Sequence, residues 1–165
     1  MNTGILFVCT GNICRSPTAE GVLRIKLAKA GLNTRIRLDS VGLIGYHVGD
    51  PPDPRSRKVA AEKGYPIDDL RARQIAESDF QNFPWMIAMD QGHARELQSM
   101  APIGKNVQIH TLLSFWPESP TQDVPDPYYG TLDGFHHTFD LIDQGTDALL
   151  AFIKSKLDGR PPQKP

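Results

Sequence analysis

A cysteine and an arginine lie six residues apart near the N-terminus, and their side chains suit a displacement reaction at phosphorus. The segment reads Cys9-Thr10-Gly11-Asn12-Ile13-Cys14-Arg15-Ser16. A thiolate is a strong nucleophile, and a guanidinium can bind two phosphate oxygens at once. The five intervening residues can curl around one tetrahedral dianion with their N–H groups pointing inward. We therefore predict a phosphate-binding loop in which Cys9 attacks phosphorus and Arg15 holds the phosphate oxygens.

The remaining residues of this loop have expected supporting roles. We expect phosphate contacts from Thr10, Gly11, Asn12, Ile13, Cys14 and Ser16. Gly11 is expected to relieve the unusual backbone dihedrals of a tight loop. Ser16 is expected to cap the following helix and to donate a hydrogen bond to the thiolate as it leaves. Because N–H groups at a helix N-terminus stabilise a thiolate, we expect Cys9 to be ionised at neutral pH.

Two alternatives stand beside this interpretation of the loop. Cys14 could trap an oxidised Cys9 as a disulfide, or it could be a buried thiol that packs the loop. For the whole segment, the structural alternative makes Cys9 a small apolar residue at a strand end and Arg15 a solvated cation. An arginine in the first turn opposes the helix dipole, which disfavours that alternative.

Hydrolysis of a phosphate ester also needs an acid that protonates the leaving oxygen. Asp126 is the best candidate, since prolines on both sides restrict the backbone and Pro127 favours an extended conformation at Asp126. The same carboxylate could then act as a base on water. The alternative is a plain Asp-Pro turn.

Three tyrosines are expected to form a pocket for an aromatic substrate, namely Tyr46, Tyr128 and Tyr129. The histidines have no partner pattern and are interpreted as structural or exposed: His47, His93, His110, His136 and His137. Asp90 reaches the same edge of the sheet, but helix capping is its expected role. Cys9 and Cys14 lack the short spacing of a zinc site, so we expect no metal and no cofactor.

The elements that must position these residues follow from hydrophobic patterning. Apolar runs predict strands at 4–9, 35–40, 85–89 and 107–112, and helices at 17–30, 54–63, 92–99 and 133–157. Four prolines make 114–130 a long loop. Alternating strands and helices predict an α/β, three-layer, doubly wound domain with a mostly four-stranded parallel sheet flanked by helices. We expect this single domain to span residues 1–157, with 158–165 as a disordered C-terminal tail.

Composition limits the function classes that remain. With 165 residues and a net charge of −1, the chain has no general positive field for nucleic acid or an anionic membrane. Two cysteines near the N-terminus are not a secreted disulfide framework, and no run approaches a membrane helix in length. Gly104-Lys105 precedes Asn106 rather than Ser or Thr, which excludes a nucleoside-triphosphate loop. We expect a cytoplasmic protein.

The segments Val8–Pro17 and Asp126–Gly130 resemble the two signatures of the low-molecular-weight protein tyrosine phosphatases. The likeness extends over residues 3 to 157. It implies a metal-independent cysteinyl-phosphate mechanism with Cys9, Arg15 and Asp126 in the roles given above. It also implies that Asn12 and Ser16 hold the loop, that Ser40 supports Asn12, and that Cys14 forms a reversible disulfide with Cys9.

The resemblance implies tyrosine-phosphorylated proteins as partners, with a tyrosine kinase among the possibilities, and a monomer or weak dimer. Three other functions are weighed against it. Protein arginine phosphatases have a similar loop, but they typically carry threonine where Ile13 lies and lack the paired tyrosines. A phosphate-binding regulatory module without turnover would not need Cys9, Arg15 and Asp126 together. Arsenate reductases need further cysteines, and none follows Cys14.

Overall fold

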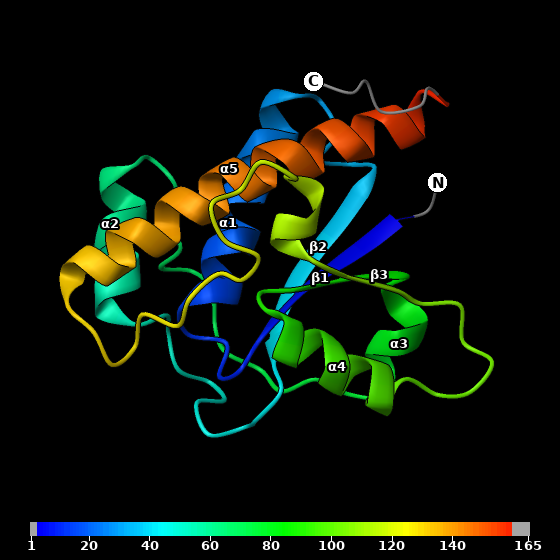
Figure 1. Cartoon of the computed structure of the whole chain (residues 1–165), viewed down its shortest axis with the longest axis horizontal. Coiled ribbons are helices and arrows are strands. Elements are labelled where there is room, and N and C mark those ends of the chain that lie inside the picture. Colours follow the sequence, from blue (N-terminus) through cyan, green and yellow to red (C-terminus); the bar gives the residue numbers. More distant parts are fainter. Residues whose placement is uncertain (1–2, 160–165) are drawn as a thin grey trace.

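The computed structural model describes residues 3–159, which form a four-stranded parallel sheet with helices on both faces (Figure 1). The strand order is β2-β1-β3-β4. The strands are β1 (Thr3–Cys9), β2 (Ile36–Gly42), β3 (Trp85–Ala88) and β4 (Gln108–Thr111). β1 pairs with β2 along its whole length, with Thr3 opposite Ile36 and Cys9 opposite Gly42. The predicted fold class is confirmed.

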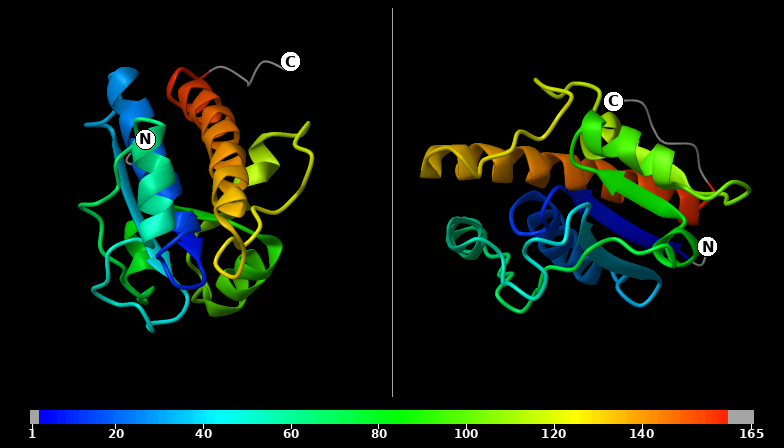
Figure 2. Two further views of the ribbon diagram at one scale, coloured as in Figure 1. Left: turned by 90° about the vertical axis from the view of Figure 1, so that its left-hand side faces the viewer. Right: turned by 90° about the horizontal axis from the view of Figure 1, so that it is seen from below.

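The helices divide between the two faces of the sheet. The helical elements are α1 (Arg15–Lys29), α2 (Pro54–Glu62), α3 (Asp79–Asn82), α4 (Gln91–Met100), the 3₁₀ turn η1 (Leu112–Phe115) and α5 (Leu132–Leu157). One apolar core joins the sheet to α1 and α5, and a second joins it to α3 and α4. A third core packs α2 against α1 and α5, and Figure 2 shows these three helices side by side.

Burial on both faces explains why β1 is apolar throughout. Ile5, Leu6, Phe7 and Val8 are each at most 2 % exposed, because alternate residues of the strand enter opposite cores. In the sheet, β2 lies on one side of β1, and β3, which comes later in the chain, lies on the other side. The connections after β1 and β3 therefore diverge at the carboxyl edge of the sheet, which is where open parallel sheets bind ligands.

Helix ends differ from the prediction in one informative place. α1 begins at Arg15, its N-cap is Cys14, and no side chain caps it. The expectation that Ser16 caps this helix is wrong, because Ser16 lies inside the first turn and its hydroxyl has other partners. The predicted cap of α2 is confirmed: the Asp53 carboxylate accepts a hydrogen bond from the N–H of Arg55 at 2.8 Å, and Pro54 follows it.

Two further segments complete the comparison with the sequence. The short α3 was not predicted, and η1 includes Leu112, the last residue of the predicted fourth strand, together with the first residues of the predicted long loop. Of the predicted C-terminal tail, residues 160–165 lie outside the described residues. No helix within residues 3–159 is both long enough and apolar enough to cross a membrane.

Candidate active site

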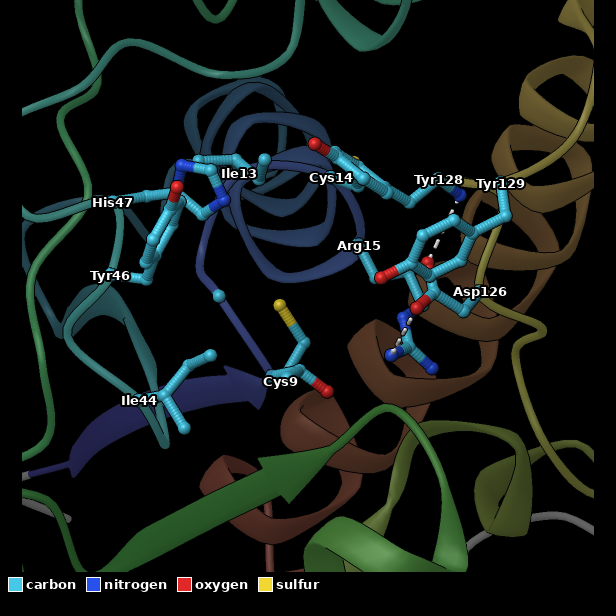
Figure 3. A pocket seen from close by; sticks show the side chains of 12 residues that line it. Cys9, Ile13, Cys14, Arg15, Ile44, Tyr46, His47, Asp126, Tyr128 and Tyr129 are labelled. Atoms are coloured by element: carbon cyan, nitrogen blue, oxygen red, sulfur yellow. Dashed lines mark hydrogen bonds and ion pairs between the residues drawn. The ribbon is translucent and has the colours of Figure 1, made fainter.

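A pocket of about 280 Å³ opens at the carboxyl edge of the sheet. It is lined by Cys9, Thr10, Gly11, Ile13, Cys14, Arg15, Ile44, Tyr46, His47, Asp126, Tyr128 and Tyr129. Every residue predicted as catalytic or as part of the tyrosine pocket is in this set. The Cys9 thiol points into the space between two groups of side chains, with Ile44, Tyr46 and His47 on one side and Asp126, Tyr128 and Tyr129 on the other (Figure 3).

Buried side-chain hydrogen bonds fix the loop after β1 on the side that faces away from the pocket. Asn12 has a left-handed backbone with φ of 58°, and its side-chain N–H₂ donates to Ser16 Oγ at 2.8 Å and to Ser40 Oγ at 2.9 Å. Ser16 Oγ lies 2.9 Å from Cys9 Sγ. The side chains of Asn12, Ser16 and Ser40 therefore lie behind the pocket, where they fix the loop and touch the sulfur.

The expectation about Gly11 is wrong, because the strained residue of the loop is Asn12. Gly42 is the glycine that the geometry requires. A Cβ on Gly42 would lie 2.9 Å from the carbonyl carbon of Gly11 and 2.9 Å from the carbonyl oxygen of Thr10. Beyond β2, the N–H groups of Leu43 and Ile44 donate to the carbonyls of Cys9 and Thr10, each at 3.0 Å. This close approach extends the strand pairing along the start of the loop.

Arg15 is a buried cation, 4 % exposed, whose guanidinium has two fixed acceptors. Its Nη1 donates to Asp90 Oδ2 at 2.9 Å and to the carbonyl of Val124 at 3.0 Å, and its Nη2 lies 3.8 Å from Asp126 Oδ2. Burial would raise the pKa of Asp90, but the hydrogen bond from the His93 N–H and the pairing with Arg15 lower it below its ordinary value. Asp90 therefore caps α4, as predicted, and also orients Arg15, which was not predicted.

Asp126 lies on the loop that follows Val124, and its side chain is 44 % exposed. Val124 is fully buried, and its N–H donates at 2.9 Å to the carbonyl of Met89, the residue directly after β3. One carboxylate oxygen, Oδ1, accepts the Tyr128 N–H at 3.0 Å. The other, Oδ2, faces Arg15, so the carboxyl group is held at the pocket with one oxygen available for proton transfer.

Aromatic rings form the rim of the pocket. The rings of Tyr46 and His47 meet edge to face at 4.8 Å between centroids, and His47 and Tyr128 lie 6.5 Å apart. Tyr129 is 90 % exposed. The sequence interpretation missed Ile44 and His47. Their place in the same loop as Tyr46, directly after a predicted strand, was the available signal.

A second histidine, His93, contacts the loop that follows β1. His93 Nε2 lies 2.8 Å from Thr10 Oγ1, and His93 is 7 % exposed. Burial and the nearby Arg15 lower the pKa of His93 below its ordinary value. The interpretation of all five histidines as structural or exposed is corrected for His47, which lines the pocket, whereas His93 is buried and holds Thr10, a structural role. His93 was detectable only through its place in the first turn after Asp90.

Cys14, the N-cap residue of α1, is a buried thiol. Burial, and secondarily the charge of Asp53, raises the pKa of the Cys14 thiol to about 12. Cys14 is therefore a neutral thiol over the whole physiological range of pH. Both cysteines are free in this structure.

We expect iodoacetamide to alkylate Cys9 and to spare Cys14 between pH 6 and 9, because only about one Cys14 thiol in a thousand is ionised at pH 9. Mass spectrometry of the peptides after timed labelling measures both sites. Saturating inorganic phosphate should protect Cys9. Labelling of Cys14 at a rate equal to that of Cys9 would contradict the description of Cys14 as a neutral thiol.

Among the described residues, no three His, Cys, Asp or Glu side chains are grouped so that they could hold a metal ion. The reactive side chains that line the pocket include the Cys9 thiol, the Arg15 guanidinium, the Asp126 carboxyl group and the His47 ring.

Comparison with known proteins agrees with this geometry. Residues 4–158 match the family described as low molecular weight phosphotyrosine protein phosphatase. A low molecular weight protein-tyrosine-phosphatase of Streptomyces coelicolor is 40% identical over 97% of this chain and 99% of its own length. A protein tyrosine phosphatase of Entamoeba histolytica, solved with Hepes in the active site, superposes with a TM-score of 0.89 at 36% identity, over 94% of this chain and 99% of that one.

A Drosophila arginine phosphatase has the same fold, with a TM-score of 0.86 at 30% identity, over 92% of this chain and 98% of that one. The sequence match over nearly the whole chain and the shared fold, taken with the cysteine-centred loop at the edge of the sheet, lead to one assignment. This chain belongs to the low-molecular-weight protein tyrosine phosphatase family.

Proposed function

We propose that this chain hydrolyses phosphotyrosine in proteins, with Cys9 as nucleophile, Arg15 as phosphate ligand and Asp126 as acid and then base. One observation carries the proposal: the Cys9 thiol, the Arg15 guanidinium and the Asp126 carboxyl group line a single pocket with an aromatic rim. A thiolate, a phosphate ligand and a proton donor are the groups that a phosphate ester transfer requires.

In the first step, the Cys9 thiolate attacks phosphorus, the S–P bond forms and the bond from phosphorus to the phenolic oxygen breaks. The Asp126 carboxyl group gives its proton to the leaving oxygen. Arg15 can bind two phosphate oxygens and follow them as charge redistributes in the transition state. Its contacts with Asp90 and the Val124 carbonyl keep the guanidinium in one orientation, so little reorganisation is needed during transfer.

In the second step, the Asp126 carboxylate takes a proton from water, the water oxygen attacks phosphorus and the S–P bond breaks. Inorganic phosphate leaves, and the Cys9 thiolate and protonated Asp126 are restored. Ser16 Oγ, 2.9 Å from Cys9 Sγ, is placed to donate a hydrogen bond to the sulfur as negative charge returns to it. Asn12 holds that hydroxyl in place by donating to the same oxygen at 2.8 Å.

Phosphotyrosine is favoured over phosphoarginine by the chemistry of the rim. Ile13 offers methyl groups, and Tyr46 and Tyr128 offer ring faces and edges, all of which suit a phenyl ring. A phosphoarginine guanidine carries N–H donors whose burial needs acceptors. Asp126 is the carboxylate among the pocket residues, and the proposed mechanism already uses it.

The deciding experiment compares phosphate release from matched phosphotyrosine and phosphoarginine peptides, in reductant and EDTA. We expect kcat/KM to favour the phosphotyrosine peptide at least about tenfold, because Asp126 is used for proton transfer and the guanidine donors would then lack a carboxylate partner in the pocket. The Cys9→Ser variant serves as the blank. Equal rates, or faster release from phosphoarginine, would overturn the proposed substrate class.

The proposal extends to the partners of the protein. Its substrates would be tyrosine-phosphorylated proteins, a tyrosine kinase among them, and the exposed Tyr129 could itself be a kinase target. A mechanism that depends on a free Cys9 thiol suits the reducing conditions of the cytoplasm.

A further inference from the structure

We propose that Arg55 is a positioning residue that clamps the loop carrying Asp126 to the phosphate-binding loop, and that it thereby governs proton transfer to the leaving group. This inference rests on the proposed role of Asp126. It concerns a residue outside both sequence signatures, at the start of α2.

The segment 126–131 needs an external support. Five of its six residues are exposed, and its internal hydrogen bonds are local, such as Gly130 N–H to the Pro127 carbonyl at 3.0 Å. Within residues 3–159, Gly134 of α5 donates to the carbonyl of Thr131 at the end of this segment, and the other hydrogen bonds that join the segment to another element are donated by Arg55. Its Nη2 donates to the carbonyl of Tyr128 at 3.1 Å and its Nη1 to that of Gly130 at 3.5 Å.

Arg55 is itself fixed on the opposite side. Its Nε donates to Asp53 Oδ1 at 3.0 Å and its Nη2 to Asp53 Oδ2 at 2.9 Å, so the two planar groups meet as a fork. Asp53 is buried, which alone would raise its carboxyl pKa, but the hydrogen bonds from Arg55 lower it below its ordinary value. The guanidinium also lies 4.3 Å from the ring centroid of Phe135 on α5.

Asp53 links this clamp to the nucleophile. Its backbone N–H donates to the carbonyl of Ile13 at 2.8 Å, within the phosphate-binding loop. A continuous path therefore runs from Ile13 through Asp53 and Arg55 to the carbonyl of Tyr128. The Tyr128 N–H in turn holds Asp126 Oδ1 at 3.0 Å. The position of the acid relative to the phosphate-binding loop depends on this path and on three further contacts: the 3.8 Å pair of Arg15 and Asp126, the Arg15 bond to the Val124 carbonyl, and the Thr138 bond to the Pro125 carbonyl.

The consequence for catalysis is specific. A misplaced acid slows proton transfer, and proton transfer matters most when the leaving oxygen is strongly basic. Loss of the clamp should therefore slow the hydrolysis of esters with basic leaving groups and spare those with acidic ones. A general loss of folding or of phosphate binding would slow all substrates alike.

The test measures kcat/KM for a series of aryl phosphates whose leaving-group pKa values span several units. We expect Arg55→Gln to lower kcat/KM about tenfold for phenyl phosphate and less than twofold for the most acidic phenol, which steepens the dependence on leaving-group pKa. Arg55→Lys should behave like Arg55→Gln, because a lysine keeps the charge but cannot form the fork. Arg57→Gln is the matched control on the same helix, since Arg57 donates to the Pro52 carbonyl and not to the Asp126 loop.

Asp126→Asn separates this inference from the proposed function. Asp126→Asn should make kcat/KM depend more steeply on leaving-group pKa than Arg55→Gln does. Adding Arg55→Gln to Asp126→Asn should cause no further loss of kcat/KM, since both changes affect the same proton transfer. An equal loss for all leaving groups, full additivity in the double variant, or wild-type behaviour of Arg55→Lys would overturn the clamp. If Asp126→Asn leaves the dependence unchanged, the proposed acid role itself fails.

Discussion

Replacement of Cys9 by serine is expected to lower phosphate release from a phosphotyrosine peptide by at least about 10⁴-fold. The two side chains differ by one atom, so the loop and its hydrogen bonds should survive the change. A serine hydroxyl is not ionised at neutral pH, and an alkoxide is a far poorer leaving group than a thiolate in the second step. Ser16 Oγ, 2.9 Å from the sulfur, can still pair with the new hydroxyl.

Three measurements check this expectation. Phosphate release gives the loss of turnover, and calorimetric titration with inorganic phosphate should show binding within about tenfold of the wild type, because Arg15 and the loop remain. A peptide labelled with ³²P should transfer its label to the wild-type protein on rapid quenching, and not to Cys9→Ser. A serine variant that keeps more than a tenth of the activity would place the nucleophile elsewhere.

The parts of the site that the sequence could predict are those close together along the chain. Cys9 to Ser16 is a continuous segment between a buried strand and a helix, so its place at the sheet edge follows from local patterning. Asp53 and Pro54 likewise predict the start of α2, because a capping carboxylate and a proline at the first helical position stabilise the first turn through local contacts alone.

The parts that could not be predicted depend on contacts between distant segments. Arg15 meets Asp90, 75 positions away, and the Val124 carbonyl, 109 positions away. These pairs arise because β1 and β3 are neighbours in the sheet, and strand order is a tertiary property. Local propensity also misassigned the loop's strain to Gly11, whereas three side-chain hydrogen bonds to distant groups and to Ser16 hold Asn12 at its positive φ.

Because Arg15 depends on these distant contacts, its replacement is expected to have the second large effect on activity. Arg15→Lys is expected to lower kcat/KM by about 10³-fold, although the positive charge is kept. Asp90 and the Val124 carbonyl occupy Nη1 of the arginine, which leaves the rest of the planar fork for phosphate. A lysine offers one ammonium group, which cannot satisfy these buried acceptors and also bind two phosphate oxygens.

The loss should be larger in kcat than in phosphate affinity, because the arginine guanidinium keeps its hydrogen bonds to the phosphoryl oxygens as these move apart in the transition state. Steady-state kinetics with a phosphotyrosine peptide, together with the inhibition constant of inorganic phosphate, separates the two. Arg24→Lys is the matched control on α1, since Arg24 is half-buried, lies outside the pocket lining and pairs with Asp69. It should keep wild-type rates. A loss below tenfold in Arg15→Lys would mean that charge alone binds the phosphate and that the orientation set by Asp90 has no part in the rate.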